Sequence, residues 1–206
     1  MSDALDALDA AFFRRWLTTA AATVAREAER LTTLDSPIGD ADHGTNLNRG
    51  FTAVTASLEK EPPDTPGAVL ALAGRRLIST VGGASGPLYG TLLRSTGKAL
   101  GDAAEVDREQ LAGALRAGLD AVMKLGGAAP GDKTMIDALV PAVDALDAGG
   151  FAAARTAAEE GALATTPLQA RKGRASYLGE RSIGHQDPGA TSSALLVAAL
   201  AEADGE

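Results

Sequence analysis

Apolar residues recur at every third or fourth position along most of this chain, the spacing that lines one face of an α-helix. The first such run covers residues 9–33, where Phe13, Trp16, Leu17 and Val24 fall on one face. Aromatic residues make up only 3% of the chain, and alanine and leucine dominate its apolar positions. This composition favours closely packed helices over β-sheet. We therefore predict an all-α fold.

Similar runs follow, separated by breaks that are rich in glycine, proline and aspartate. The eight expected helices cover residues 9–33, 44–58, 66–79, 91–100, 106–125, 135–146, 151–165 and 190–202. Three helix starts carry typical N-cap residues. These are Asp64 or Thr65 before Pro66, Asp132 before the sixth helix and Asp187 before the eighth. The predicted architecture is eight helices joined by loops.

The length and composition of the chain fit one domain. A chain of 206 residues of which 45% are hydrophobic can bury one well-packed core. We find no internal repeat, linker or low-complexity tail that would indicate a second unit. Residues 1–206 are therefore expected to form a single domain.

The charge balance and the absence of cysteine exclude several classes of function. The chain has 19 basic and 27 acidic residues, a formal net charge of -8, which opposes binding to nucleic acid or an anionic membrane. Without cysteine there are no disulfides, thiolate metal sites or thiol catalysis. Residues 1–6 are acidic where a signal peptide is basic, and no apolar run reaches the roughly 18 residues of a membrane span. We predict a cytoplasmic protein.

The densest group of chemically active side chains lies in residues 35–46, between the first two expected helices. Asp35, Asp40, Asp42 and His43 stand close together there. Ionised carboxylates 4 Å apart repel one another by about 1 to 4 kcal/mol per pair, depending on the effective dielectric constant, and a bound cation removes this cost. Oxygen ligands suit Mg²⁺ better than Zn²⁺. The alternative is a solvated acidic loop, since the spacing does not match an EF-hand.

Two further segments indicate a ligand that contains phosphate. Residues 44–46 open the second helix, and helix N-termini attract anions because their first N–H groups are unpaired. Residues 82–90 place four glycines in an otherwise helical pattern, at a cost of about 1 kcal/mol each relative to alanine. Either a ligand approaches the backbone there or two helices cross closely, and both explanations stay open.

The segment 168–188 lacks apolar periodicity and carries the cations Arg171, Lys172, Arg174 and Arg181. In an acidic protein such a cluster favours binding of an anion. An irregular segment of about twenty residues is typical of a functional lid. A solvated basic surface is the alternative.

The remaining candidates are less specific. His43 and His185 both lie in loops rich in aspartate and glycine, and each is either a ligand contact or a structural residue. Residues 126–133 have ordinary turn composition, and Met135 is by default a core residue, although methionine can cover a nucleobase. The sequence shows neither an identifiable Ser-His-Asp order nor a G-x-x-x-x-G-K-[ST] motif, which excludes a hydrolase triad and a Walker P-loop.

Five glycine-containing segments resemble the DhaL family, the nucleotide-binding L subunits of dihydroxyacetone kinase. They are GDADHGTN (39–46), GGASGPLYG (82–90), GDKTMID (131–137), GRASYLGERS (173–182) and GHQDPGATSS (184–193). The resemblance covers essentially the whole chain. It implies a barrel of eight antiparallel helices with a nucleotide and metal site in the loops at one end.

The resemblance also implies roles for individual residues. Asp35, Asp40 and Asp42 would hold two Mg²⁺ ions that bridge the phosphates of ADP or ATP, and His43 and Arg174 would be catalytic. The implied nucleotide-binding residues are His43, Gly44, Thr45, Asn46, Ala84, Ser85, Gly126, Met135, Arg174, Asp187, Pro188 and Gly189.

The implied activity is that of a phosphotransferase. Bound ADP would take a phosphoryl group from the phosphohistidine of an M subunit of the phosphotransferase system and pass it to dihydroxyacetone on a separate K subunit. A homodimer is compatible with this arrangement. The alternatives are an ATP-dependent kinase component for another small ketose, an ADP-loaded regulatory interaction protein and a metal-dependent phosphatase.

Overall fold

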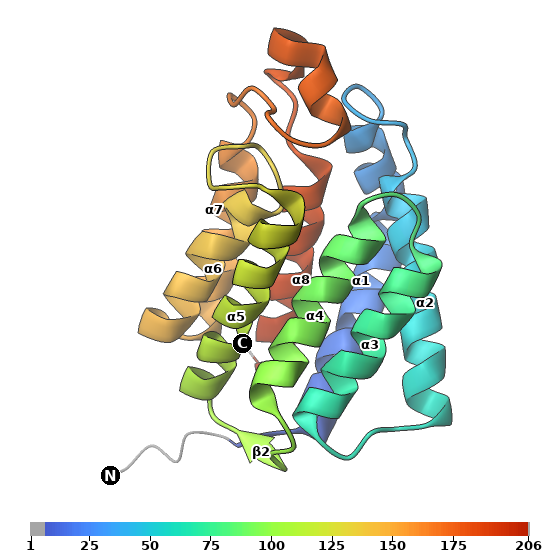
Figure 1. Ribbon diagram of the computed structural model, residues 1–206, viewed down its shortest axis with the longest axis vertical. Helices are drawn as coiled ribbons and strands as arrows, with labels where there is room; N and C mark the ends of the chain where they lie inside the picture. The colour runs from blue at the N-terminus through green and yellow to red at the C-terminus, as the bar shows by residue number, and fades with distance from the viewer. Residues whose placement is uncertain (1–6, 206) are drawn as a thin grey trace.

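The computed structural model describes residues 7–205 and confirms the all-α prediction (Figure 1). The helices are α1 (Ala10–Asp35), α2 (His43–Lys60), α3 (Pro66–Thr80), α4 (Ser85–Leu100), α5 (Arg108–Gly126), α6 (Ile136–Gly149), α7 (Phe151–Ala164) and α8 (Pro188–Asp204), with the 3-10 helix η1 (Arg174–Ser182) between α7 and α8. Two very short strands, β1 (Leu8–Asp9) and β2 (Glu105–Val106), pair in antiparallel orientation.

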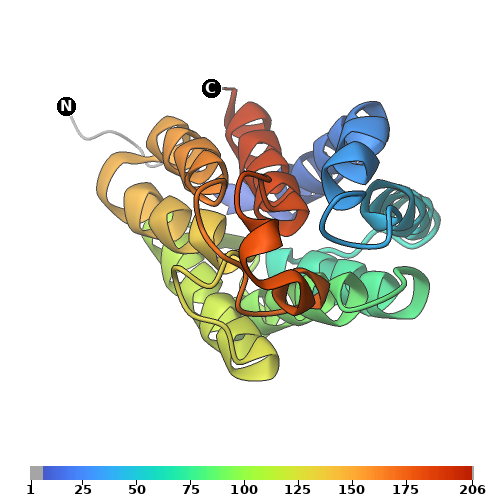
Figure 2. The same ribbon diagram turned by 90° about the horizontal axis from the view of Figure 1, so that it is seen from above.

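Within residues 7–205, the eight α-helices form a closed ring. Each helix packs against the next one in sequence, and α8 packs back against α1. Because most connections are short, neighbouring helices run antiparallel. Seen from above, η1 lies over the middle of the ring (Figure 2). One end of the ring is therefore covered by the segment that joins α7 to α8.

Apolar side chains fill the interior of the ring. Phe13, Trp16 and Leu17 of α1 are buried, as their spacing predicts. The indole Nε1 of Trp16 donates a hydrogen bond to the carbonyl oxygen of Leu196 at 2.9 Å, which links α1 to α8. Burying each large apolar side chain contributes about 1.5 to 3 kcal/mol. The helical spacing in the sequence thus fixes which face of α1 enters the core.

Two of the predicted N-caps are confirmed. The side chain of Thr65 accepts a hydrogen bond from the backbone N–H of Ala68 at 3.3 Å, and Pro66 stands in the first turn of α3. Asp187 accepts a hydrogen bond from the backbone N–H of Ala190 at 2.7 Å, at the start of α8. Both side chains satisfy N–H groups that the helix itself leaves unpaired.

The predicted N-cap at Asp132 is wrong. Helix α6 begins at Ile136, and the carboxylate of Asp137 accepts hydrogen bonds from the backbone N–H groups of Thr134 at 2.7 Å and Gly131 at 2.5 Å. The carboxylate of Asp132 instead closes the preceding turn by accepting a hydrogen bond from the backbone N–H of Ala129 at 2.9 Å. A carboxylate inside the helix, rather than one before it, holds the loop that leads into α6.

Helix α4 begins at Ser85, not at position 91 as the glycine-rich pattern predicts. Gly90 lies inside the helix, where a Cβ atom would come within 2.3 Å of Cγ1 of Ile78 and 2.7 Å of the carbonyl oxygen of Gly74. At Gly90, the close crossing of α3 and α4 is therefore the right explanation. The glycine removes the side chain that would keep the two backbones apart.

The segment that covers the ring, residues 166–184, is here called the lid, and it contains more regular structure than predicted. Helix η1 runs through it and is broken at Gly179, whose φ of 57° allows the chain to turn between two helical pieces. A small apolar cluster, separate from the main core, joins the lid to the loop after α1. Its members are Ile38, Ala170, Ala175 and, partly buried, Leu178.

In residues 7–205, no helix combines the length and the apolar character that crossing a membrane requires. The prediction about the acidic residues 1–6 concerns a segment outside the described residues.

Gly97→Ala is expected to destabilise the fold by about 1 to 3 kcal/mol, measured by urea denaturation. A Cβ at Gly97 would lie 2.5 Å from the carbonyl oxygen of Gly67, a backbone atom of α3 that cannot swing aside. Gly113→Ala is the control, because a Cβ there meets nothing within 4 Å. Replacing glycine by alanine in a helix interior stabilises the fold by about 0.5 to 1 kcal/mol. Equal effects of the two substitutions would contradict the close crossing.

Candidate metal and nucleotide site

The loop between α1 and α2 folds around the carboxylate of Asp35. Oδ2 of Asp35 accepts hydrogen bonds from the backbone N–H groups of Asp42 at 3.0 Å and His43 at 3.3 Å. A side chain at the end of α1 thus caps the start of α2, where negative charge is favoured. Gly39 is required beside it, because a Cβ there would lie 1.9 Å from Oδ1 of Asp35. Ala41 has a φ of 60°, which costs about 1 to 2 kcal/mol for a residue with a side chain.

The three predicted metal ligands converge in this loop. One carboxylate oxygen from each of Asp35, Asp40 and Asp42 lies within 4.8 Å of the others. Asp35 is buried, whereas Asp40 and Asp42 are exposed. This oxygen-only donor set, open to water on one side, fits Mg²⁺, which keeps several waters and binds through few carboxylates. The residues present are therefore able to hold such an ion.

Arg174 reaches this acidic loop from the lid. Its Nη2 lies 3.0 Å from Oδ2 of Asp40, and both side chains are more than a third exposed. An exposed ion pair of this kind contributes at most about 1 kcal/mol. The guanidinium group can therefore leave Asp40 at little cost when a stronger anion binds beside it.

These groups lie at the edge of a pocket of about 410 Å³, within the roughly 300–1,000 Å³ typical of ligand sites. Apolar side chains such as Leu88, Val122 and Ile136 also line it and suit a flat aromatic ring. Twelve of the predicted site residues belong to the lining: Asp35, Asp40, Asp42, His43, Ala84, Ser85, Gly126, Met135, Arg174, Asp187, Pro188 and Gly189.

Three predicted nucleotide-binding residues lie in the first turn of α2 but do not belong to the pocket lining. Gly44 faces α1, since a Cβ there would lie 1.9 Å from the carbonyl oxygen of Ala28. Thr45 is exposed, and the side chain of Asn46 accepts a hydrogen bond from Arg49 at 2.8 Å. The amide of Asn46 nevertheless lies next to the pocket residue Gly82, since a Cβ there would come within 3.3 Å of its Nδ2.

His43 is buried at the start of α2, beside the pocket. Burial lowers the pKa of its imidazole, although the neighbouring carboxylates, Asp35 foremost, act in the opposite direction. Nε2 hydrogen-bonds with Oγ of Ser192 at 2.8 Å, and Nδ1 with Oγ of Ser85 at 3.3 Å. The ring is therefore neutral near pH 7, with one nitrogen donating and the other accepting. It is held between α4 and α8.

Sequence reasoning missed the buried hydroxyl groups next to His43. The hydroxyl of Tyr89 donates a hydrogen bond to the carbonyl oxygen of Gly189 at 3.1 Å and lies 2.7 Å from Oγ of Ser192. Burial raises the pKa of Tyr89 to about 12, so the phenol keeps its proton. The available signal was the pair Ser192 and Ser193 near the start of a mostly apolar eighth helix, because buried hydroxyls need partners.

Lys133 is a second residue that sequence reasoning missed. Its side chain is only 1% exposed, and Nζ donates hydrogen bonds to the carbonyl oxygens of Leu168 at 2.9 Å and Ser182 at 2.8 Å. Burial lowers the pKa of its ammonium group. Lysine is almost never fully buried unless its charge has partners. The turn-like composition of this loop gives no sign that such partners exist.

The remaining candidate residues differ in whether they line the pocket. Lys172 lines the pocket together with Arg174, whereas Arg171 and Arg181 are exposed outside the lining. His185 is half-buried and also lies outside it. Two glycines just before α4, Gly82 and Gly83, line the pocket, so a ligand can approach the backbone there.

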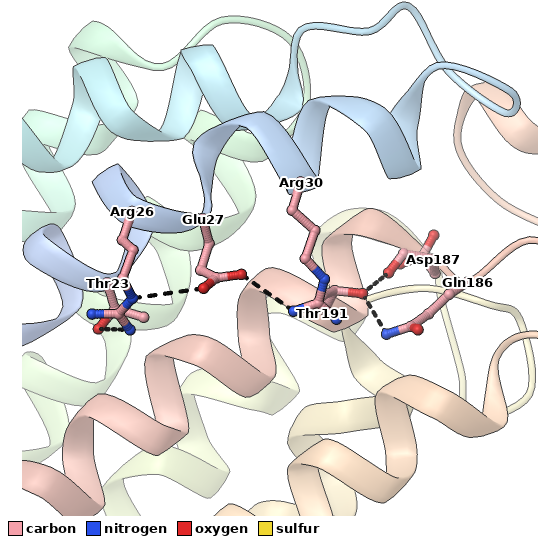
Figure 3. Close-up of polar contacts among 7 residues, drawn as sticks. All are labelled: Thr23, Arg26, Glu27, Arg30, Gln186, Asp187 and Thr191. Atoms are coloured by element: carbon pink, nitrogen blue, oxygen red, sulfur yellow. Dashed lines mark hydrogen bonds and ion pairs between the residues drawn. The ribbon is translucent and has the colours of Figure 1, made fainter.

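Asp187 lines the pocket at the start of α8. Burial raises the pKa of its carboxyl group to about 7, while the hydrogen bond from the backbone of Ala190 acts in the opposite direction. The hydroxyl of Thr191 donates to the carbonyl oxygen of Asp187 at 2.7 Å and accepts from the amide of Gln186 at 2.8 Å (Figure 3). This arrangement fixes the first turn of α8 against the pocket.

The Asp187 carboxyl is expected to make the nucleotide-free protein less stable as the pH rises from about 5 to 7. Its folded pKa of about 7 lies above the ordinary 3.8, so the folded state keeps a proton that the unfolded chain loses. This group contributes a slope of up to about 1.4 kcal/mol per pH unit. Asp187→Asn removes that slope in urea unfolding measured at several pH values, whereas the exposed control Asp102→Asn keeps it. A wild-type slope in Asp187→Asn would contradict the assignment.

Comparison with known proteins agrees with the sequence resemblance. The model of the DAK2 domain matches residues 37–202. The chain is 46% identical to the PEP-dependent dihydroxyacetone kinase, ADP-binding subunit DhaL of Escherichia coli K12, over 93% of this chain and 95% of that protein. It is 42% identical to the L-erythrulose 1-kinase of Mycolicibacterium smegmatis, over 85% of this chain but only 32% of that protein.

The fold is also similar to that of a solved enzyme. The crystal structure of the dihydroxyacetone kinase from C. freundii in complex with AMP-PNP and Mg²⁺ superimposes with a TM-score of 0.76 and 29% identity, covering 98% of this chain and 36% of that one. The present chain thus spans about a third of that kinase. The match of the domain model and the identity to a DhaL subunit over nearly the whole length show that this chain belongs to the DAK2-domain family, among the DhaL subunits of dihydroxyacetone kinases.

Proposed function

We propose that this chain is the nucleotide-binding subunit of a dihydroxyacetone kinase. The observation that carries the proposal is the convergence of three carboxylates within 4.8 Å at the edge of a pocket of about 410 Å³, with Arg174 beside them. Phosphoryl transfer requires mainly positioning and neutralisation of charge. The pocket provides both without a covalent nucleophile.

The proposed ligands are ADP or ATP and two Mg²⁺ ions held by Asp35, Asp40 and Asp42. Bound Mg²⁺ would neutralise phosphate oxygens, and bound ADP would become ATP by taking a phosphoryl group from a phosphohistidine donor and return to ADP when dihydroxyacetone takes that group. Asp35 supplies a carboxylate that is already fixed by two backbone N–H groups. Asp40 and Asp42 are exposed, and Asp40 can adjust once Arg174 leaves its ion pair.

Arg174 and His43 have different proposed tasks. Arg174 is a mobile cation that leaves Asp40 for the phosphate oxygens and so holds the nucleotide under the lid. His43 is neutral and both of its ring nitrogens bond to hydroxyl groups, so it would contact the ligand by giving up the longer bond, to Ser85, without adding charge. The apolar lining around Met135 and Val122 receives the adenine ring.

The site is open to solvent on one side, so partner proteins can reach it. The exposed carboxylates Asp40 and Asp42 face solvent at the end of the ring, where a K subunit carrying dihydroxyacetone and a phosphohistidine-bearing M subunit would approach in turn. The E. coli relative is named PEP-dependent, which favours a phosphoprotein donor over free ATP. A cytoplasmic location stays a prediction. Homodimer formation stays a prediction.

A second candidate is an ATP-dependent kinase component for another small ketose. It is favoured by the 42% identity to the L-erythrulose 1-kinase of M. smegmatis. The two functions differ in how the nucleotide behaves. A coenzyme-type ADP remains bound through gel filtration, whereas a substrate nucleotide exchanges freely with ATP.

Native mass spectrometry of the protein purified in magnesium buffer tests the proposed function. We expect a mass increase that corresponds to one ADP and two Mg²⁺ ions, and transfer of the phosphoryl group when a K subunit with dihydroxyacetone and a phosphorylated donor are added. Absence of both nucleotide and metal after incubation with saturating Mg²⁺ and ADP would overturn the proposal.

Asp42→Ala is expected to abolish transfer and to weaken binding of Mg²⁺ with ADP by at least about 100-fold. The side chain of Asp42 makes no capping hydrogen bond to α2, so the fold should persist. Isothermal titration calorimetry measures the affinity, and Asp102→Ala, an exposed carboxylate outside the pocket lining, is the matched control. Wild-type turnover with Asp42→Ala would contradict the proposed metal site.

Arg174→Ala is expected to raise the dissociation constant for ADP about tenfold or more, since a charge-assisted hydrogen bond contributes about 1.5 to 3 kcal/mol. Unfolding stability should change by less than about 1 kcal/mol, because the ion pair with Asp40 is exposed. Arg171→Ala removes a neighbouring lid cation outside the pocket lining and serves as control. Equal nucleotide retention by both variants would contradict the role of Arg174.

A further inference from the structure

Lys133 occupies a position that the proposed function leaves unexplained. Its ammonium group is buried, and its hydrogen-bond acceptors are backbone carbonyl oxygens: Leu168 at 2.9 Å, Ser182 at 2.8 Å and, more distantly, Thr166 at 3.5 Å. An ammonium group has three donors and no acceptor, so three carbonyl groups match its full capacity. A buried cation with this set of partners fixes the course of the backbone around it.

The three carbonyl groups come from the two ends of the lid. Thr166 and Leu168 lie where the lid leaves α7, and Ser182 lies where it returns towards α8. The ends are also joined directly, because the backbone N–H of Gly184 donates to Thr166 at 2.9 Å and that of Ala170 to Oγ of Ser182 at 2.9 Å. Lys133 thus sits at a closed neck below the lid.

The other side of this contact is the loop between α5 and α6. The backbone N–H of Arg171 donates to the carbonyl oxygen of Asp132 at 3.1 Å, directly before Lys133. Lys133 itself has a φ of 63°, a costly conformation, and the carboxylate of Asp137 holds the surrounding turn by its bond to Thr134. The anchor for the lid is therefore a loop that is fixed to α6, and Lys133 lines the pocket together with Met135.

Beyond the neck, the lid has few attachments. Arg174 makes a single exposed ion pair with Asp40, Tyr177 is 88% exposed, and the small cluster around Ile38 and Ala175 provides the apolar contact. The position of Arg174 over the pocket therefore depends on where the neck holds the two lid ends.

We infer that Lys133 is a positioning residue, whose ammonium group ties both ends of the lid to the loop before α6 and thereby holds Arg174 over the nucleotide phosphates. The nucleotide part of this inference rests on the proposed function. The mechanical part, that the charge of Lys133 keeps the lid closed, is independent of the proposed function.

Trypsin tests the mechanical part, because the lid carries four sites for it: Arg171, Lys172, Arg174 and Arg181. In nucleotide-free protein we expect Lys133→Met to raise the rate of cleavage within the lid at least tenfold, with fragments identified by mass spectrometry. Methionine keeps the length of the side chain and its backbone preference but donates no hydrogen bonds. Lys60→Met, an exposed lysine at the end of α2, should cleave at the wild-type rate.

Rescue and nucleotide kinetics separate positioning from general destabilisation. Lys133→Arg restores a buried cation and should return lid cleavage to within about threefold of wild type. Lys133→Met should also speed dissociation of a fluorescent ADP analogue with Mg²⁺ at least fivefold. If Lys133→Met does not fold, Lys133→Gln, whose amide retains two donors, takes its place in both measurements.

Three results would overturn the inference. Lid cleavage could stay within twofold of wild type, it could rise only with urea concentration as global unfolding does, or the lid could open while the dissociation rate of the ADP analogue stays unchanged. A wild-type protein that binds no ADP would instead contradict the proposed function, and the trypsin measurement would still decide the role of Lys133 in the lid.

Discussion

The carboxylate of Asp35 is the point on which the site depends. It accepts two hydrogen bonds from the first backbone N–H groups of α2 and also belongs to the group of three converging carboxylates. The repulsion within that group is partly offset by the positive end of α2, worth about 0.3 to 1 kcal/mol for a nearby charge. The start of α2 and the metal-binding geometry are thus one arrangement, because the same side chain produces both.

The closed antiparallel ring explains why the functional segments recur along the sequence. In such a ring, the connections α1–α2, α3–α4, α5–α6 and α7–α8 all emerge at one end. The pocket lining comes from these four connections and the helix ends next to them, whereas the connections at the opposite end contribute none of it. The segments that resemble the DhaL family come from four separate stretches of the sequence and are therefore adjacent in space.

Much of this could be predicted from the sequence, since local patterns determine it. Helical spacing located the helices, and the density of carboxylates in residues 35–46 located the converging group. The start of α4 was misplaced because glycine is unfavourable in an isolated helix, while a close helix crossing requires it at Gly90. The contact between His43 and Ser192 joins residues 149 positions apart, and no local pattern reports it. The burial of Lys133 likewise depends on carbonyl groups supplied by the lid.

The closure of the ring by α8 has a consequence for how the protein is made. Among the described helices α8 comes last in the chain, yet it packs against α1, and Asp187, Gly189 and Ser192 at its start lie in or beside the pocket. A nascent chain that has formed α1 to α7 therefore exposes a long apolar groove and has no complete ligand site. Docking of α8 covers this groove and completes the ligand site in one step, so any folding intermediate that lacks α8 exposes apolar surface and is prone to aggregation.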